Sequence, residues 1–198
     1  QRGHIQIAYY TWMMLGLFIL VKIFYYFKDK EYNIIHFKEY LKKKLIIITS
    51  IILGFLLSLS IYLPILNYSK LSTRGSEAGG FGIDNATQWS LNFKEALTFF
   101  FPYTYGFGGK GYWGQLPFTD FPNYIGVIII FLAIIGYTKS KINKEYKLFL
   151  LLVILFSFLI SLGKYFLGFY SLFYNWFPFF DKFRAPIYIL IIFQFSLN

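Results

Sequence analysis

The side chains best suited to chemistry in this sequence are cations that border long apolar runs. Arg74 follows one such run, Lys164 follows another, and Arg184 precedes a third. Arginine presents a planar fork of N–H donors that matches phosphate oxygens, and lysine presents a point charge. We therefore expect these residues to bind the phosphate of a lipid-linked ligand, with Arg74 close to Arg184. Anchoring at a membrane interface is the alternative role.

Aromatic side chains form a second group of candidates. Trp89, Tyr112 and Trp113 lie in a glycine- and aromatic-rich segment, residues 67–120, whose charges balance. Flat aromatic faces stack on sugar rings and isoprene units, so these residues predict a surface that contacts a sugar or a lipid chain. In a folded lid of this kind, Tyr112 and Trp113 should be partly buried. An aromatic segment that lies among lipid headgroups is the alternative.

Polar groups that could catalyse a reaction or bind a metal are scarce. His4 and Gln6 open the first apolar run, where they form either a contact between helices or part of a ligand site. Of the acids at 77, 84 and 120, we take Asp84 as the candidate catalytic base. The chain has no cysteine, which excludes a thiolate zinc site, and its two histidines cannot form a catalytic zinc site by themselves; no cofactor is identified, and a divalent metal stays open.

The composition indicates what kind of protein must position these groups. Of the 198 residues, 57% are hydrophobic, 24% are aromatic and only 14% are charged. Globular domains are about 45–50% apolar and about 25% charged. A net charge of +10 would suit a nucleic-acid partner, but the lysines cluster in short segments between apolar runs. This distribution favours membrane topology and a lipid-bilayer partner, with no nucleic acid.

We predict an all-α polytopic membrane protein that forms a single membrane domain. Four complete transmembrane helices and a truncated fifth are expected at residues 5–27, 45–66, 121–137, 148–162 and 186–198. The last run is too short for the roughly 20 residues of a bilayer crossing. Because it stops at Asn198 and the first residue is Gln1, we expect the sequence to be an internal part of a longer protein.

The charges of the connecting loops predict an orientation. Residues 28–44 and 138–147 are rich in lysine, which places them in the cytoplasm, whereas residues 67–120 and 163–185 are then extracytoplasmic. Within the long loop, residues 92–101 predict a short helix, opened by Ser90 or Asn92 and ended by Pro102.

A set of short motifs, in one order along the chain, resembles the bacterial YfhO-like membrane proteins. These motifs are Gly3-His4-Ile5-Gln6 (with Ile5 where proline is usual), Ser72-Thr73-Arg74-Gly75, Trp89-Ser90, Phe101-Pro102, Tyr112-Trp113-Gly114, Phe118-Thr119, Tyr124-Ile125-Gly126, Gly163-Lys164 and Phe183-Arg184-Ala185. A composition heavy in Phe, Ile, Lys, Tyr and Asn is also typical of a bacterium with an AT-rich genome.

The resemblance implies a relation to the GT-C glycosyltransferases, and hence a place in the bacterial inner membrane. Such enzymes take a sugar from a polyprenyl-phosphate donor on the outer face, here for transfer to a cell-envelope acceptor. Their catalytic carboxylate typically lies in the first outer loop, which we expect to precede this sequence. A lipid or polysaccharide transporter and a non-catalytic subunit of an envelope assembly are the alternatives.

Overall fold

The computed structural model describes residues 5–28, 45, 49–50, 52–54, 56, 82–117 and 123–197. The chain divides into two compact units, one formed by residues 1–21 with 81–198 and the other by residues 22–80. Every regular element among the described residues is a helix, which confirms the all-α class. In the second unit, the last turns of the first helix end at Lys28, whose Nζ lies 5.8 Å from the Tyr25 ring centroid.

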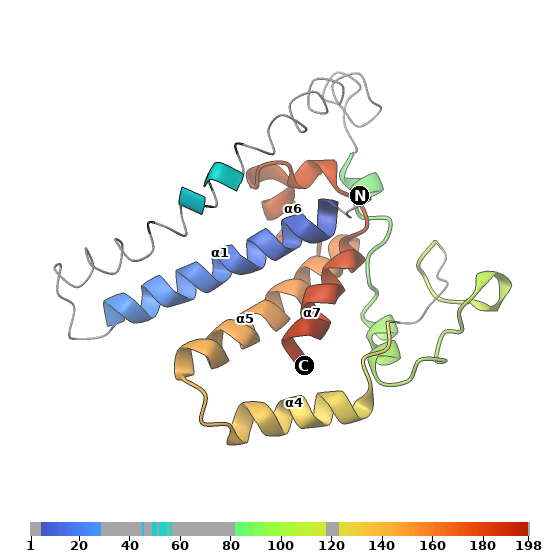
Figure 1. The fold of residues 1–198 in the computed structure, drawn as a ribbon. Coiled ribbons are helices and arrows are strands. Elements are labelled where there is room, and N and C mark those ends of the chain that lie inside the picture. The colour runs from blue at the N-terminus through green and yellow to red at the C-terminus, as the bar shows by residue number, and fades with distance from the viewer. Residues whose placement is uncertain are drawn as a thin grey trace. The chain divides into compact units, whose positions relative to one another are not determined.

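Six α-helices and five 3-10 helices (η) have their bounds within the described residues (Figure 1). In chain order the elements of the described chain are α1 (Ile5–Lys28), α3 (Ile83–Ala86), η2 (Lys94–Phe99), η3 (Gly109–Gly111), α4 (Val127–Lys139), α5 (Lys144–Ser161), η4 (Gly163–Phe166), α6 (Leu167–Trp176), η5 (Phe180–Lys182), η6 (Pro186–Ile189) and α7 (Leu190–Leu197).

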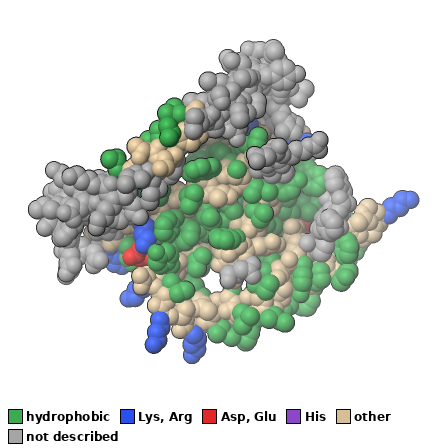
Figure 2. Space-filling view, viewed as in Figure 1, with side chains coloured by type: hydrophobic (Ala, Val, Ile, Leu, Met, Phe, Trp, Pro, Cys, Tyr) green, Lys and Arg blue, Asp and Glu red, His purple; other side chains and the backbone are tan. Residues whose placement is uncertain are grey.

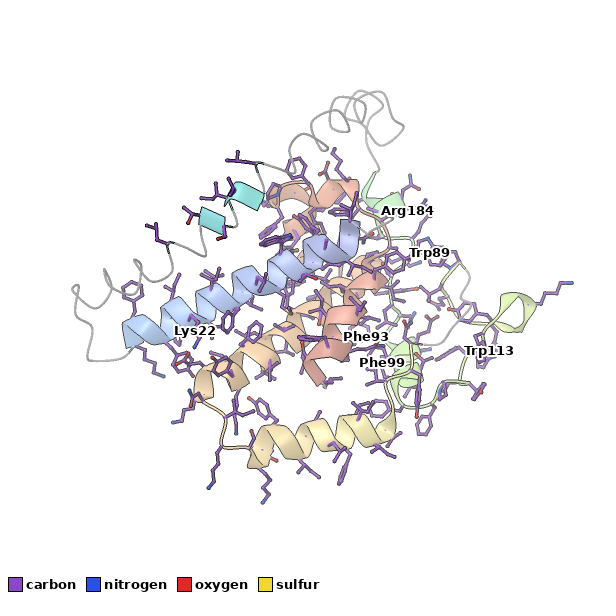
Figure 3. All side chains as sticks on the ribbon, viewed as in Figure 1. Lys22, Trp89, Phe93, Phe99, Trp113 and Arg184 are labelled. Carbon is purple, nitrogen blue, oxygen red and sulfur yellow. The ribbon has the colours of Figure 1, made fainter. Side chains whose placement is uncertain are left out.

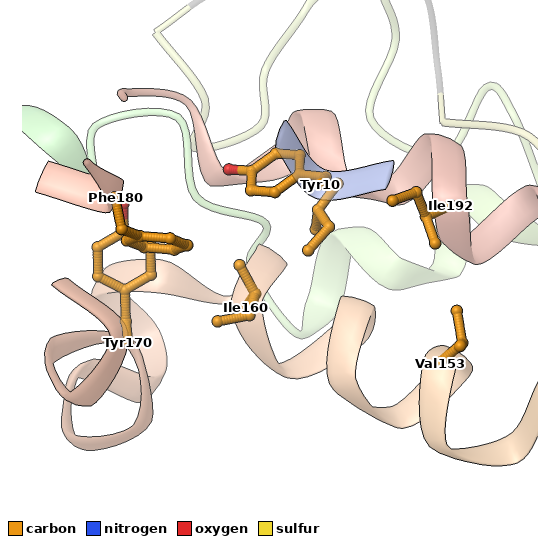
Figure 4. Close-up of a cluster of buried hydrophobic side chains, with 7 residues drawn as sticks. Tyr10, Val153, Ile160, Tyr170, Phe180 and Ile192 are labelled. Atoms are coloured by element: carbon orange, nitrogen blue, oxygen red, sulfur yellow. The ribbon is translucent and has the colours of Figure 1, made fainter. Parts of the chain in front are cut away.

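The core of the larger unit lies where α1, α5, α6 and α7 meet. Its buried members are Tyr10, Val153, Ile160, Tyr170, Phe180, Ile189 and Ile192 (Figure 4). Toward the other end of α5, the Phe18 ring of α1 packs 5.1 Å from the ring of Phe149. The start of α1 therefore lies near the end of α5, and the two helices run antiparallel.

A second apolar cluster holds the segment before α4 against α5 and α7. It contains Leu91, Phe99, Ile125 and Leu190, all buried. The Phe99 carbonyl accepts hydrogen bonds from the backbone N–H groups of Ile125 (3.2 Å) and Gly126 (3.3 Å), which fixes the start of α4 beside η2. The Phe99 ring lies 5.3 Å from that of Phe193. Residues 91–99 are thus packed into the helices and do not form a loose surface ribbon.

Gly163 marks a sharp change of direction after α5. Lys144–Ser161 and Gly163–Trp176 form a pair of helical segments bent by 108°. Gly163 has φ +42°, and a Cβ atom there would lie 2.0 Å from Ser90 Oγ and 3.0 Å from Pro186 Cγ. Both the backbone conformation and the close approach of Ser90 require glycine at this position.

Most predicted helices are present, with one correction and several shifted ends. Helices α1 and α5 match the predicted spans 5–27 and 148–162, and α4 starts at Val127, six residues after the predicted start at 121. Residues 163–185, predicted as a connection between two spans, contain η4, α6 and η5, and the sequence analysis did not identify these helical elements. Of the predicted span 45–66, only residues 45, 49–50, 52–54 and 56 are described, and these are helical.

Among the described residues, one helix is long and apolar enough to cross a membrane, Ile5–Tyr25 within α1. The count rises to two if the bent pair that starts at Lys144 is one span. Helix α4 and the segment Pro186–Leu197 are apolar but shorter. The four complete spans predicted from the sequence are not confirmed by helix length.

Gly163→Ala should destabilise the fold. Overpacking of a buried site costs about 1–3 kcal/mol, and the left-handed backbone adds strain to any residue with a Cβ. We expect a lower thermal midpoint for the purified protein in detergent.

Gly136→Ala is the matched control, because Gly136 lies inside α4 with nothing within 4 Å of the added Cβ. It should leave the midpoint unchanged or raise it slightly, through better helix propensity. Equal midpoints for both variants would contradict the assignment of Gly163.

Candidate functional site

Residues 89–91 form hydrogen bonds with the ends of several helical elements. We call this region the junction and define it as residues 89–91, 161–164 and 185–187. The Trp89 carbonyl accepts a hydrogen bond from the Ile187 N–H (3.2 Å), and the Leu91 N–H donates to the Ser161 carbonyl (2.8 Å). Between them, the buried Ser90 Oγ accepts from the Lys164 N–H (3.0 Å) and donates to the Thr87 carbonyl (2.6 Å).

The backbones of two of the predicted phosphate-binding cations lie in or next to the junction. Lys164 is bound through its own N–H, and Arg184 lies two residues before Pro186, which touches Gly163. Both side chains are exposed. Lys164 Nζ lies 5.1 Å from the centroid of the Tyr165 ring. Figure 3 shows Arg184 and Trp89 at the same end of the molecule.

Acidic groups near the junction have different surroundings. Asp84 is exposed in α3, and α3 packs against η5. In η5, Asp181 pairs with Lys182 at 2.5 Å, with both side chains partly exposed. Among the described acids at this end of the molecule, Asp84 is exposed and, unlike Asp181, forms no ion pair with a described residue. It remains the candidate base that the sequence predicts.

Gln6 fastens α1 to the junction. Its side chain is buried, and Nε2 donates to the Tyr10 hydroxyl (2.8 Å) and to the Ala185 carbonyl (3.1 Å). Ala185 has φ +66°, an unfavourable conformation for a residue with a Cβ, and a hydrogen bond from the Tyr188 N–H (3.2 Å) also holds its carbonyl. The sequence allowed Gln6 to be a helix contact or a ligand contact, and its geometry is that of the helix contact.

A separate part of the site is an aromatic loop, residues 103–113. The Trp113 N–H donates to the Tyr105 carbonyl (3.1 Å), and their rings lie 4.9 Å apart. The Tyr103 and Phe107 rings lie 5.4 Å apart. Trp113 is 69% exposed and lies on the outlying loop (Figure 3), so the expectation that it would be partly buried is wrong. Tyr112 is half-buried, as expected.

A buried carboxylate anchors the base of the aromatic loop. Glu95 is only 3% exposed, and its Oε1 accepts hydrogen bonds from the Tyr112 hydroxyl (2.9 Å) and the Gln115 N–H. The Tyr112 hydroxyl in turn accepts from the Leu116 N–H (2.8 Å). At Gly114 a Cβ would lie 2.2 Å from the Tyr112 hydroxyl oxygen, so the backbone approach requires glycine.

The same network connects the aromatic loop to the junction. Gln115 Oε1 accepts from Asn92 Nδ2 and from the Tyr165 hydroxyl, both at 2.6 Å. Tyr165 follows Lys164 directly, so the loop is tied beside the cation. Asn92 Oδ1 also accepts from the Lys94 N–H (2.8 Å) at the start of η2, but the N-cap position of this helix is Phe93, so neither Ser90 nor Asn92 opens it as predicted.

Electrostatics keep the Tyr112 hydroxyl in its neutral form. Burial, and then the hydrogen bond and charge of Glu95, raise the pKa of Tyr112 well above its ordinary value of 10.0. The contribution of the neutral hydroxyl to stability is therefore complete below pH 10 and is lost only as the pH rises above that value. The donor bond to Glu95 is present throughout the neutral range.

Trp89, Lys164 and Arg184 lie in or next to the junction. Hydrogen bonds through Glu95, Gln115 and Tyr165 connect Tyr112 to the same region. His4 and Arg74 lie outside the described residues, and with them the expected approach of Arg74 to Arg184. Sequence reasoning missed the roles of Glu95, Gln115 and Tyr165. The one signal for Glu95 was its position as a lone acid on a short aromatic helix.

Comparisons with family models, with curated proteins and with solved structures give no significant match to this chain.

Tyr112→Phe should loosen the aromatic loop and leave the helices intact. The ring stays in place, but Glu95 loses a donor and the Leu116 N–H loses its acceptor. Leaving a buried group unpaired costs about 1–3 kcal/mol, so amide hydrogen exchange at Gln115 and Leu116 should accelerate by about tenfold.

The control is Tyr103→Phe, at an exposed position of the same loop. It should leave the exchange of both amides unchanged. Identical exchange in the two variants would contradict the anchoring role of the Tyr112 hydroxyl.

Proposed function

We propose that this chain is a multi-spanning membrane protein, with the junction on the outer face. Large apolar side chains are exposed along most of α4 and along α1, including Trp12, Leu20, Ile128 and Phe131. Figure 2 shows apolar side chains over much of the visible face. Soluble proteins seldom expose apolar patches beyond a few hundred Å², and a hydrocarbon environment accounts for such a surface.

The placement of charge along α5 supports the same proposal. Lys139, Lys141, Lys144 and Lys147 lie at or before its first turn, and the junction lies at its last turn. Its 18 residues span about 27 Å at 1.5 Å per residue, close to the roughly 30 Å of a hydrocarbon core. The lysine-rich end is then cytoplasmic, by the positive-inside rule, and the junction is extracytoplasmic.

We further propose that the junction and the aromatic loop bind a lipid-linked sugar for glycosyl transfer in the bacterial inner membrane. The observation that carries this proposal is an exposed aromatic loop that hydrogen bonds connect to Tyr165, the neighbour of the exposed Lys164, with the exposed Arg184 next to the same junction. Arg184 and Lys164 bind phosphate, and Trp113 with Tyr105 stacks on a sugar or isoprene unit. The resemblance to YfhO-like proteins supplies the reaction, a transfer from a polyprenyl-phosphate donor to an envelope acceptor.

The catalytic carboxylate is expected to precede this sequence, and if it lies within the described residues, Asp84 is the candidate general base. Its carboxylate would accept the proton of the acceptor hydroxyl as the sugar leaves the phosphate. The described acids form no group of three that could hold a metal ion, although the acids at 77 and 120 lie outside the described residues.

Arg184→Lys should reduce sugar transfer about tenfold or more. The change keeps the charge and removes the two-pronged donor, and a hydrogen bond to a charged group is worth about 1.5–3 kcal/mol. The measurement is transfer from a radiolabelled polyprenyl-phosphate sugar, in membranes that contain the protein.

Lys182→Arg, within the Asp181 ion pair of η5, is the control and should retain full transfer. If the Arg184→Lys variant transfers sugar as well as the unchanged protein at equal protein level, Arg184 acts only as an interface anchor. No transfer by the unchanged protein would contradict the enzymatic proposal and favour the transporter or assembly role.

Trp113→Ala should weaken sugar binding without disturbing the fold. Stacking of a large aromatic face contributes on the order of 1 kcal/mol, so the apparent affinity for the donor should fall about five- to tenfold. Trp12→Ala, on α1, is the matched control because Trp12 is 58% exposed against 69% for Trp113. An equal loss in both variants would argue for a general effect on the membrane protein.

A further inference from the structure

Residues 165–180 are unusual for a segment outside the predicted membrane spans. Ten of these sixteen residues are aromatic and none is charged, while Lys164 and the Asp181–Lys182 pair flank the segment on either side. Water-exposed connections are typically polar, whereas tyrosine and tryptophan are enriched at the boundary between lipid and water. The composition alone thus marks this segment as different from the lysine-rich loop before α5.

Helix α6, the middle of this segment, has one covered face and one open face. On the covered face Tyr170 is fully buried, its ring 5.3 Å from that of Phe180, and Phe173 packs 5.3 Å from Phe156 of α5. On the open face Trp176 is 83% exposed, and Leu172 is exposed with it, one turn earlier. No described residue covers that face.

The direction of α6 follows from the bend at Gly163. The two helical segments differ in direction by 108°, which is close to a right angle. If α5 crosses the bilayer, as in the proposed function, α6 runs nearly parallel to the membrane surface at the level where α5 ends. Its ten residues cover about 15 Å in that plane.

We infer that α6 lies in the plane of the outer membrane interface, with Leu172 and Trp176 among the lipid headgroups and upper acyl chains. Lipid is the occupant that fits an open face with apolar and aromatic side chains and no charge, at the end of a membrane-crossing helix. The cations at both ends of the segment, Lys164 and Lys182, are then at the height of the lipid phosphates. This inference rests on the membrane crossing in the proposed function, and it places the phosphate of a lipid-linked ligand level with the junction.

Depth measurements on single-cysteine variants test this arrangement. The native chain has no cysteine, so a nitroxide label can be placed at 172, 176, 134 or 110 in the full chain. The labelled protein is reconstituted in phosphatidylcholine–phosphatidylglycerol vesicles. Collision with oxygen is then compared with collision with a water-soluble nickel chelate. Position 134 on α4 is the deep reference and position 110, on exposed η3, is the aqueous reference.

We expect Leu172→Cys and Trp176→Cys to report equal, shallow depths between those of the two references. Aqueous exposure of both, with position 134 in lipid, would overturn the in-plane helix and leave the proposed function standing. Position 176 as deep as 134 would overturn it in favour of a re-entrant helix. Aqueous exposure at 134 would contradict the multi-spanning arrangement of the proposed function, and the inference that rests on it. Label at Leu167→Cys, on the first turn of α6, repeats the measurement if one variant fails to fold.

Discussion

The hydrogen bonds of residues 89–91 are the constraint that fixes how the helix ends of the larger unit meet. Each of these residues bonds to a different neighbour, namely η6, the turn after α5 and the end of α5 itself. These bonds use backbone groups at helix ends, which have no partner within their own helix and must be satisfied elsewhere. The close approach is possible because Gly163 carries no side chain. The positions of Lys164 and Arg184 are consequences of this backbone arrangement.

Rigidity at the junction extends to the aromatic loop through polar side chains. Glu95 binds Tyr112 and Gln115, and Gln115 binds Asn92 and Tyr165. The two bonds to Glu95 satisfy a buried carboxylate, for which an unmet hydrogen bond is costly, whereas the two bonds to Gln115 are exposed. The loop can therefore expose Trp113 without becoming a flexible tether. A surface aromatic on an ordered base loses less conformational entropy on binding, which favours affinity for flat ligands.

The sequence predicted best where local pattern decides structure. The apolar run of α1 predicted that helix to within one residue at its end, and a short helix was predicted within residues 92–101, where η2 lies at Lys94–Phe99. Pro102 did not set the end of η2, which stops at Phe99 because its carbonyl turns to bind Ile125 and Gly126.

Contacts over long sequence distances were beyond pattern reasoning. Glu95 and Tyr112 are 17 residues apart, and neither carries a local mark of the other. Helix α6 was missed because Gly163 and Lys164 resemble a loop, and an apolar periodicity does not reveal the direction in which a chain bends. Trp113 was expected to be partly buried, but Tyr112 is the residue that packs inward, while Trp113 pairs with Tyr105 on the surface. The candidate cations were found because charge at the edge of an apolar run is visible in the sequence itself.

The hydrogen bonds of Gln6 have a consequence for the timing of synthesis. Its amide reaches the Ala185 carbonyl across 179 residues, whereas the Tyr10 hydroxyl is only four residues away. A ribosome that adds about 5–20 residues per second needs about 9–36 s to make the intervening chain. During that interval α1 exists without its distant acceptor, and the Tyr10 hydroxyl supplies one from within the same helix. The nascent helix therefore carries one of the two acceptors of Gln6 from the start, and the second is made much later.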